Sequence, residues 1–187
     1  MIIWLASYPK SGNTFLRSIL SSYFFSETGD FNFDLLKRID QFPNPKIFKL
    51  LGIDLKKKNE IEKNYIAAQK LINKENKSVQ FWKTHSSFCK FDNKYDFTDL
   101  INTAGVIYIV RDPRNVVLSY SHHFQKTIDD SLVDLNSNLA IQQSKNDYIS
   151  VLVGSWNFNY NSWKQLKPLN KYLLIRYEDL INNTEKT

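Results

Sequence analysis

The chain has 187 residues, of which 42% are hydrophobic, 14% aromatic and 24% charged, and its net charge is +6. This composition excludes a disordered chain, and the length suits one domain with its own core. The single cysteine, Cys89, excludes an intramolecular disulfide framework and a cysteine-based metal cluster. No apolar run approaches the roughly 18 residues of a membrane helix, and Lys10 lies too early for a signal-peptide core. We therefore expect no membrane span and a location in the cytoplasm.

Lysine dominates the basic residues, with 20 Lys and 5 Arg among 25. The densest cluster consists of Lys46, Lys49, Lys56, Lys57, Lys58 and Lys63. A nucleic-acid site is one interpretation, but few aromatic residues lie among these lysines. We favour a solvated surface and expect no nucleic-acid partner.

Apolar runs and helical patterns alternate along the chain. The runs expected to form buried strands are 2–7, 79–84, 106–110 and 172–175. The segments expected to form helices are 14–25, 61–72, 115–124 and 151–166. Irregular connections are expected at 40–58 and 86–95. Strands that alternate with helices predict an α/β fold with a mainly parallel sheet.

The segment Ser7–Phe15 (SYPKSGNTF) follows the first expected strand directly and opens the first expected helix. A helix N-terminus attracts anions, because its first backbone N–H groups lack intrahelical partners and the helix dipole favours negative charge. Gly12 allows the backbone to approach a ligand closely, and Lys10 adds a full positive charge. An ordinary helix cap is the simpler alternative, but the density of donors favours a phosphate or sulfate site. The segment is not a Walker A loop, since Lys10 precedes the only glycine in it.

The segment Val106–Phe124 has an arginine at the end of an expected strand and a serine on the helix that follows. Ligands of open parallel sheets bind at this end of the strands. Arg111 and Ser119 could therefore hold a second phosphate together. An ion pair of Arg111 with Asp112 or Asp179 is an equally open alternative.

His85 comes just after the second expected strand, where an imidazole could act as a general base for a hydroxyl nucleophile. A structural or exposed histidine is the alternative. His122 and His123 are adjacent on an expected helix and point to different faces, so we expect no metal site there. In Leu173–Leu180, Arg176 ends a strand and acidic residues begin a helix, where the dipole favours them. We expect a structural role for this segment.

Together these segments resemble the family of sulfotransferases that use 3′-phosphoadenosine 5′-phosphosulfate (PAPS). YPKSGNTF at 8–15 is similar to the family's 5′-phosphosulfate loop, and YIVRDPRNVVLSY at 108–120 to its 3′-phosphate motif. Further similar segments are KTH at 83–85, which matches the segment carrying the catalytic base, GSW at 154–156 and IRYEDL at 175–180. The resemblance implies a central parallel sheet flanked by helices, related to the P-loop kinases, in a single domain over 1–187.

The resemblance also implies roles for individual residues, with PAPS as the co-substrate and no metal. His85 would take the proton from the acceptor hydroxyl or amine. Lys10 would neutralise the leaving phosphate oxygen, and Lys83 would orient the sulfonyl oxygens. Arg111 and Ser119 would hold the 3′-phosphate. The residues that would cradle the 5′-phosphosulfate are Lys10, Ser11, Gly12, Asn13, Thr14 and Phe15.

Two departures from the family pattern stand out. Phe15 occupies the position where the family usually has tryptophan. The family also continues past IRYEDL to an Arg-Lys-Gly segment that adds contacts to the 3′-phosphate, and this chain has no such segment. The resemblance thus implies a C-terminally truncated sulfotransferase, for which we expect weakened donor binding.

Two other functions remain open. One is a nucleotide-binding fragment with little or no activity, and the other is a P-loop kinase, which would need Mg²⁺ and a Gly-Lys-Ser/Thr sequence that is missing here. The acceptor would be shaped by segments 26–60, 86–95 and 125–150. Their aromatic residues would suit an apolar alcohol or phenol, whereas the lysine cluster would suit an acidic glycan. The sequence predicts a small-molecule or glycan acceptor without choosing between them, and it does not indicate the oligomeric state.

Overall fold

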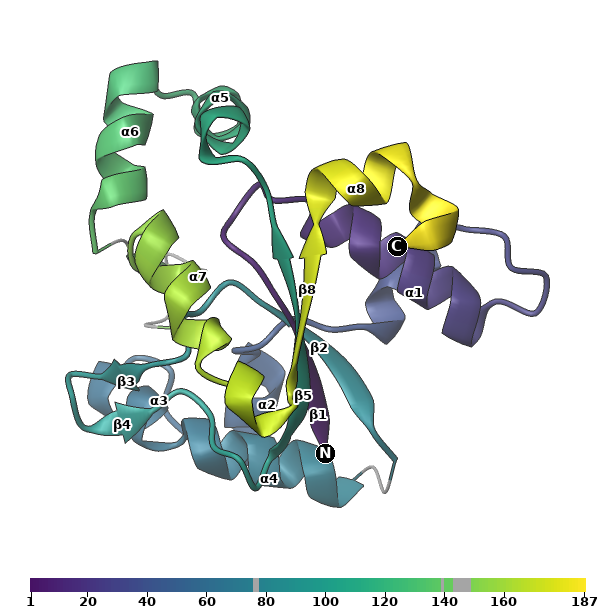
Figure 1. Cartoon of the computed structure of the whole chain (residues 1–187). Coiled ribbons are helices and arrows are strands. Elements are labelled where there is room, and N and C mark those ends of the chain that lie inside the picture. The colour runs from purple at the N-terminus through teal and green to yellow at the C-terminus, as the bar shows by residue number, and fades with distance from the viewer. Residues whose placement is uncertain (76–77, 139, 143–148) are drawn as a thin grey trace.

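A four-stranded, wholly parallel sheet in the order β2-β1-β5-β8 lies at the centre of the protein. The computed structural model describes residues 1–75, 78–138, 140–142 and 149–187. Helices lie on both faces of the sheet (Figure 1). The strands of this sheet are β1 (Ile2–Ala6), β2 (Gln80–Thr84), β5 (Thr103–Val110) and β8 (Tyr172–Arg176). The expected α/β fold with a parallel sheet is confirmed.

The two inner strands, β1 and β5, bury apolar side chains on both faces of the sheet, because helices cover both faces. Within β1, Trp4 and Ala6 belong to the larger core cluster, whereas Leu5 between them belongs to a second cluster on the opposite face. The ring of Trp4 is fully buried, and its indole nitrogen donates a hydrogen bond to the Thr103 hydroxyl at 3.0 Å. The central strand is therefore fixed from both sides.

One face of the sheet carries α1 and α8, and the other carries α2, α4 and α7 (Figure 1). The helix α1 packs Leu16, Ile19 and Leu20 into the second core cluster, as its apolar spacing predicts. The bounds of these helices are α1 (Asn13–Phe25), α2 (Pro45–Leu50), α4 (Tyr65–Glu75), α7 (Trp156–Lys164) and α8 (Tyr177–Asn182).

A third cluster of buried side chains joins α5 (Pro113–Phe124) and α6 (Ile128–Asn136) to the loop after β1. Val116, Val117 and Tyr120 of α5 pack there with Tyr8. The remaining elements are α3 (Lys58–Lys63), the antiparallel pairs β3 (Lys90–Phe91) with β4 (Tyr95–Asp96) and β6 (Ala140–Gln142) with β7 (Ser150–Leu152), and the short 3₁₀ turns η1 (Phe33–Arg38), η2 (Lys167–Leu169) and η3 (Thr184–Lys186).

The expected helix over 151–166 is wrong in its first part. Residues of β7 pair with β6 instead, and α7 begins only at Trp156, where the Ser155 hydroxyl accepts a hydrogen bond from the backbone of Phe158. The antiparallel pairing of β7 with β6 outweighs the local helical pattern here. The expected helix over 61–72 is interrupted at Asn64, between α3 and α4.

The two connections expected to be irregular also contain short elements. Within 40–58, α2 begins at Pro45 with the Asn44 side chain as its cap. Within 86–95, the strand β3 pairs with β4. Both elements are too short to leave a clear periodic signal in the sequence.

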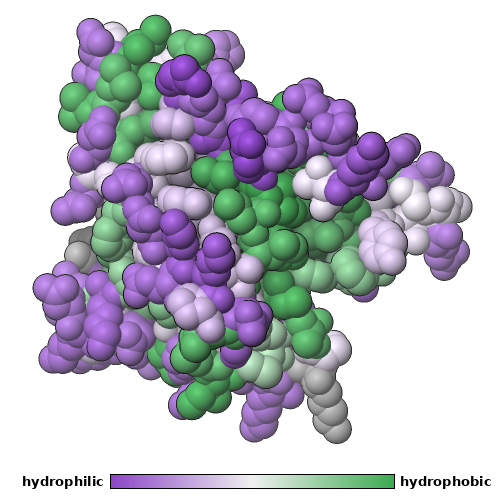
Figure 2. All heavy atoms as spheres, viewed as in Figure 1, coloured by the Kyte–Doolittle hydropathy of each residue, from purple (hydrophilic) through white to green (hydrophobic). Residues whose placement is uncertain are grey.

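The surface is mixed, with hydrophobic side chains gathered over β8 and beside α8 (Figure 2). Leu173 and Leu174 are exposed on β8, and Ile181 is exposed on α8. Over the described ranges, none of the helices has the length and apolar character needed to cross a membrane.

Candidate functional site

All four central strands run in the same direction, so their carboxyl ends meet at one edge of the sheet. The loop from β1 to α1, the residues after β2 and the turn from β5 to α5 therefore converge there (Figure 1). This edge is where open parallel sheets bind ligands. It is also where the sequence motifs predicted a site.

The loop between β1 and α1 is tightly wound. The backbone N–H of Ser11 donates a hydrogen bond to the Tyr8 carbonyl at 3.3 Å, and Lys10 and Gly12 both have positive φ, of 68° and 95°. The N-cap residue of α1, Gly12, makes no side-chain hydrogen bond to the first helical N–H groups. These features suit the binding of an anion at this helix end.

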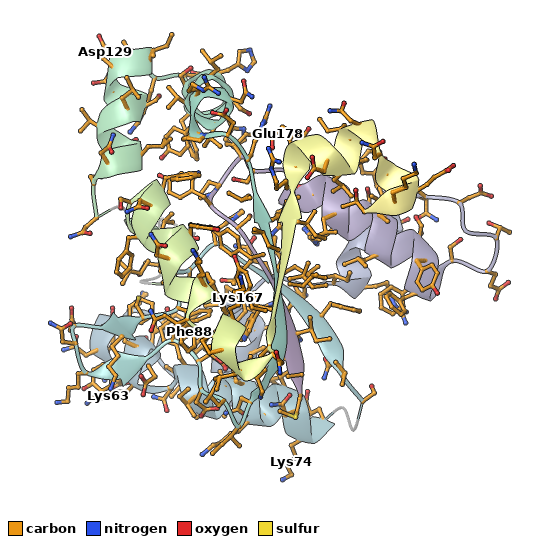
Figure 3. The ribbon with its side chains drawn as sticks, viewed as in Figure 1. Lys63, Lys74, Phe88, Asp129, Lys167 and Glu178 are labelled. Carbon is orange, nitrogen blue, oxygen red and sulfur yellow. The ribbon has the colours of Figure 1, made fainter. Side chains whose placement is uncertain are left out.

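Two features require glycine at position 12, namely its positive φ and the close approach of the Tyr177 ring. A Cβ added at Gly12 would lie 2.2 Å from Cδ2 of the Tyr177 ring. Arg111 contacts the same ring, and its guanidinium carbon lies 4.6 Å from the ring centre. Tyr177, at the start of α8, thus contacts both the loop and the arginine. Figure 3 shows its neighbour Glu178 at this end of α8, and the Glu178 carboxylate accepts a hydrogen bond from the backbone of Asp112 at 3.0 Å.

Buried polar atoms face the loop without partners. Asn13 donates its side-chain amide to the Leu5 carbonyl at 2.9 Å and to the Ser7 hydroxyl at 3.1 Å, which ties α1 to β1. Its Oδ1 and the Ser11 hydroxyl are buried without a hydrogen-bond partner in the described part of the chain. These two atoms lie in the loop and in the first turn of α1, where buried polar groups without partners are costly.

Arg111 is held in place by main chain and ring rather than by an acid. Its Nη1 donates a hydrogen bond to the Lys10 carbonyl at 3.1 Å, and its buried Nε has no partner among the described residues. The two carboxylates considered as partners lie elsewhere, because Asp112 pairs with Arg114 and Asp179 pairs with Arg176. The guanidinium therefore keeps its charge available for an anion.

His85 is oriented by the loop after β1. Its Nδ1 lies 2.8 Å from the Ser7 carbonyl and 3.2 Å from the Ser7 hydroxyl. A carbonyl can only accept, so Nδ1 carries the proton and Nε2 has a free lone pair. Burial, reinforced by the nearby charge of Lys83, lowers the pKa of His85 to about 3. The imidazole is therefore neutral at pH 7, as a general base must be.

Lys83 lies on β2, two residues before His85, and lines the same cavity. Its Nζ donates a hydrogen bond to the Gln41 side-chain oxygen at 2.8 Å. Burial, together with the cations Arg17 and Lys10, lowers the pKa of Lys83 to about 8. Positive charge is thus concentrated at this edge of the sheet.

A single cavity of about 700 Å³ collects most of these side chains. The predicted site residues that line it are Lys10, Gly12, Asn13, Thr14, Phe15, Lys83, His85, Arg111 and Ser119. Ser11 does not line it and is buried beneath the loop. Its other lining residues are Pro9, Ser18, Phe31, Phe33, His123 and Phe124. Within the described ranges, no three His, Cys, Asp or Glu side chains gather as a metal site.

Several residues of the site escaped the sequence analysis. Tyr177 was assigned to a structural segment, and Gln41 and Asn159 carried no signal. Asn159 is buried and donates hydrogen bonds to the carbonyls of His85 at 3.0 Å and Val153 at 2.8 Å. Of the acceptor segment 125–150, residues 139 and 143–148 lie outside the described residues.

A wholly parallel sheet with a helix opening directly after the loop of its first strand is an α/β architecture that binds ligands at the carboxyl ends of its strands. Comparison with known families identifies the class of protein. The model of the sulfotransferase domain matches residues 2–187. The chain therefore belongs to the sulfotransferase domain family.

Among characterised relatives, the chain is 26% identical over 179 residues to the flavonol 3-sulfotransferase of Flaveria bidentis, covering 95% of this chain and 51% of that protein. A mouse sulfotransferase in complex with 3′-phosphoadenosine 5′-phosphate (PAP) has a TM-score of 0.56 at 21% identity, over 99% of this chain and 54% of that one. Retinol dehydratase, in complex with androsterone and PAP, has a TM-score of 0.53 at 15% identity, over 98% of this chain and 56% of that one. The chain thus spans about half the length of these relatives, and its fold is that of the sulfotransferases.

Proposed function

We propose that this protein binds PAPS in the cavity at the carboxyl ends of the strands and transfers its sulfonyl group to a hydroxyl acceptor. The observation that carries the proposal is the cavity itself, which brings Lys10, Lys83, His85 and Arg111 together from three separate segments. The family and the PAP complexes of the structural relatives support the same donor.

The cavity suits a donor with phosphate at both ends. The loop after β1, with Thr14 and the first N–H groups of α1, would hold the 5′-phosphosulfate. Arg111 would place the charge of its guanidinium group on the 3′-phosphate, and the Ser119 hydroxyl would add a further donor. Phe15 would lie beside the adenine.

The chemistry requires a base and positive charge, and the cavity contains both. His85 Nε2 would accept the proton of the acceptor hydroxyl while the acceptor oxygen forms a bond to sulfur and the bridging sulfur–oxygen bond to the 5′-phosphate breaks. Lys10 would stabilise the negative charge that appears on that phosphate oxygen, and Lys83 would bind the sulfonyl oxygens. The products are a sulfate ester and PAP, and the proton remains on His85 until solvent removes it.

The acceptor side of the cavity is aromatic. Phe33 is 80% exposed, Phe31 is 43% exposed and Phe124 is 39% exposed, yet all three line this cavity. Exposed aromatic side chains around a cavity mark a site for an apolar ligand. A small apolar or aromatic alcohol fits this wall better than a glycan, and the described lysines of the cluster at 46–63 do not line the cavity. The relatives named for flavonol and crystallised with androsterone point the same way.

Sulfonyl transfer from PAPS to 2-naphthol tests the function, with the sulfate ester and PAP measured by chromatography. The variant His85→Ala should lose about 10²- to 10⁴-fold in rate while it still binds PAP. The matched control is His122→Ala, because His122 is exposed and does not line the cavity. Equal rates in the two variants would contradict the role of His85.

Binding of PAP together with the absence of product from PAPS would indicate nucleotide binding without turnover and would contradict the proposed transfer. A kinase is not favoured, since the family match is to sulfotransferases.

A further inference from the structure

The segment 36–42 crosses the edge of the sheet and is anchored on both sides. From α1, Arg17 donates hydrogen bonds to the carbonyls of Leu36 at 2.7 Å and Ile39 at 2.5 Å. From β2, the backbone N–H of Lys83 donates to the Asp40 carbonyl at 2.9 Å. The Lys83 carbonyl in turn accepts from the Phe42 N–H at 2.8 Å, and the side chains of Ile39 and Phe42 are fully buried.

These anchors place Gln41 directly beside Lys83, in parallel register with β2. The side-chain oxygen of Gln41 accepts a hydrogen bond from the ammonium group of Lys83 at 2.8 Å. In the part of the chain that the structure describes, this amide is the side-chain acceptor that Lys83 contacts. The contact depends on residues far apart in the sequence, since it joins the segment before α2 to the strand β2.

The charges around Lys83 explain why a neutral acceptor is suited to this position. Arg17 faces Lys83 from α1, Lys10 faces it from the loop after β1, and His85, a neutral imidazole, lies just after the end of β2. The nearest acid on the segment, Asp40, accepts hydrogen bonds from Asn44 and from the backbone of Gln41. An amide fixes the direction of the ammonium group without neutralising it, whereas a carboxylate would cancel its charge and repel an anionic donor.

From this geometry we infer that Gln41 is a positioning residue, which aims the ammonium group of Lys83 into the cavity and keeps it charged. The inference rests on the proposed function, in which Lys83 binds the sulfonyl oxygens. In this role Gln41 contacts neither the sulfonyl donor nor the acceptor, and it acts on the reaction through Lys83.

The test compares Gln41→Met, which keeps the size and loses the acceptor, with Gln41→Glu, which adds a charge. The titration of Lys83 is followed by NMR of chains with ¹³C-labelled lysine, and its signal is assigned by its loss in Lys83→Met. Gln41→Met should lower the Lys83 midpoint by about 0.5 to 1 pH unit, and Gln41→Glu should raise it by about 1 unit or more. The alkaline limb of the rate of sulfonyl transfer should move in the same two directions, with a roughly tenfold fall in kcat for Gln41→Met and little change in acceptor KM.

The matched control is Gln165→Met, at an exposed position at the end of α7. A purely structural role for Gln41 would lower the melting temperature and leave the Lys83 midpoint in place. Midpoints within about 0.2 pH unit of the unsubstituted chain in both Gln41 variants would overturn the inference. PAP binding by the unsubstituted chain is measured separately. An absence of PAP binding would contradict the proposed function, whereas an unchanged Lys83 midpoint would contradict only the role of Gln41.

Discussion

The close packing of Gly12 against Tyr177 predicts that Gly12→Ala is among the most damaging small substitutions in this chain. Two costs add at this position. The residue has φ of 95°, in the left-handed region, where a side chain costs about 1 to 2 kcal/mol. The new Cβ would also lie 2.2 Å from the Tyr177 ring, and such overpacking costs about 1 to 3 kcal/mol more.

Gly29 offers a matched control, because it has φ of 83° and no atom within 4 Å of an added Cβ. Gly29→Ala should therefore show only the conformational cost of about 1 to 2 kcal/mol. For a chain of this size, each kcal/mol lowers Tm by about 2 to 4 °C. We expect Gly12→Ala to lower Tm by roughly 4 to 20 °C and Gly29→Ala by roughly 2 to 8 °C.

Calorimetric melting of both variants separates the two costs. A third measurement compares Tyr177→Ala with the double variant Gly12→Ala/Tyr177→Ala. Without the ring, Gly12→Ala should lower the free energy of unfolding only as much as Gly29→Ala does. If Gly12→Ala costs no more than Gly29→Ala in the unsubstituted chain, the packing of Tyr177 on the loop is wrong, and with it the way the loop and Arg111 are held together.

Three further predictions follow from the same contacts. The pKa of His85 is about 3 in the folded chain and the ordinary 6.5 in the unfolded chain, so the free energy of unfolding in urea should fall as the pH drops from 6.5 towards 3. In His85→Gln the free energy of unfolding should depend less on pH over this range. An unchanged pH dependence would contradict a neutral imidazole at this position. Asn159→Ala removes hydrogen bonds to Tyr108, Val153 and His85, which should cost about 3 kcal/mol or more in chemical unfolding; a cost below about 1 kcal/mol would show that the network is not formed. Phe33→Ala should raise the KM for 2-naphthol by about tenfold with PAP affinity unchanged, and equal loss of both would place Phe33 on the donor side.

The strands and the site loop could be predicted because their signals are local. Each central strand is a short apolar run, and the parallel direction of the strands brings their carboxyl ends together without any further information. This is why Lys10, His85 and Arg111, each just after a strand, could be expected at one edge of the sheet. The cavity in the structure contains all three.

The features that escaped prediction depend on contacts between separate segments of the chain. Ser150–Leu152 has an apolar pattern that also suits a helix, and only its pairing with 140–142 makes it a strand. Gln41 gains its position from a bridge to Lys83, and Tyr177 from contacts with Gly12 and Arg111. Periodicity and spacing do not reveal the contacts of Gln41 and Tyr177, because these contacts depend on how the chain folds in three dimensions.

The most direct test of the donor site is calorimetric titration of the chain with PAP and with 5′-AMP, in parallel with two arginine variants. Arg111 lines the cavity and has a free Nε, whereas Arg114 is exposed and paired with Asp112. We expect PAP to bind at least about tenfold more tightly than 5′-AMP, with this preference lost in Arg111→Ala and retained in Arg114→Ala. Equal affinity for the two nucleotides, or no binding of either, would contradict a PAPS site in this protein.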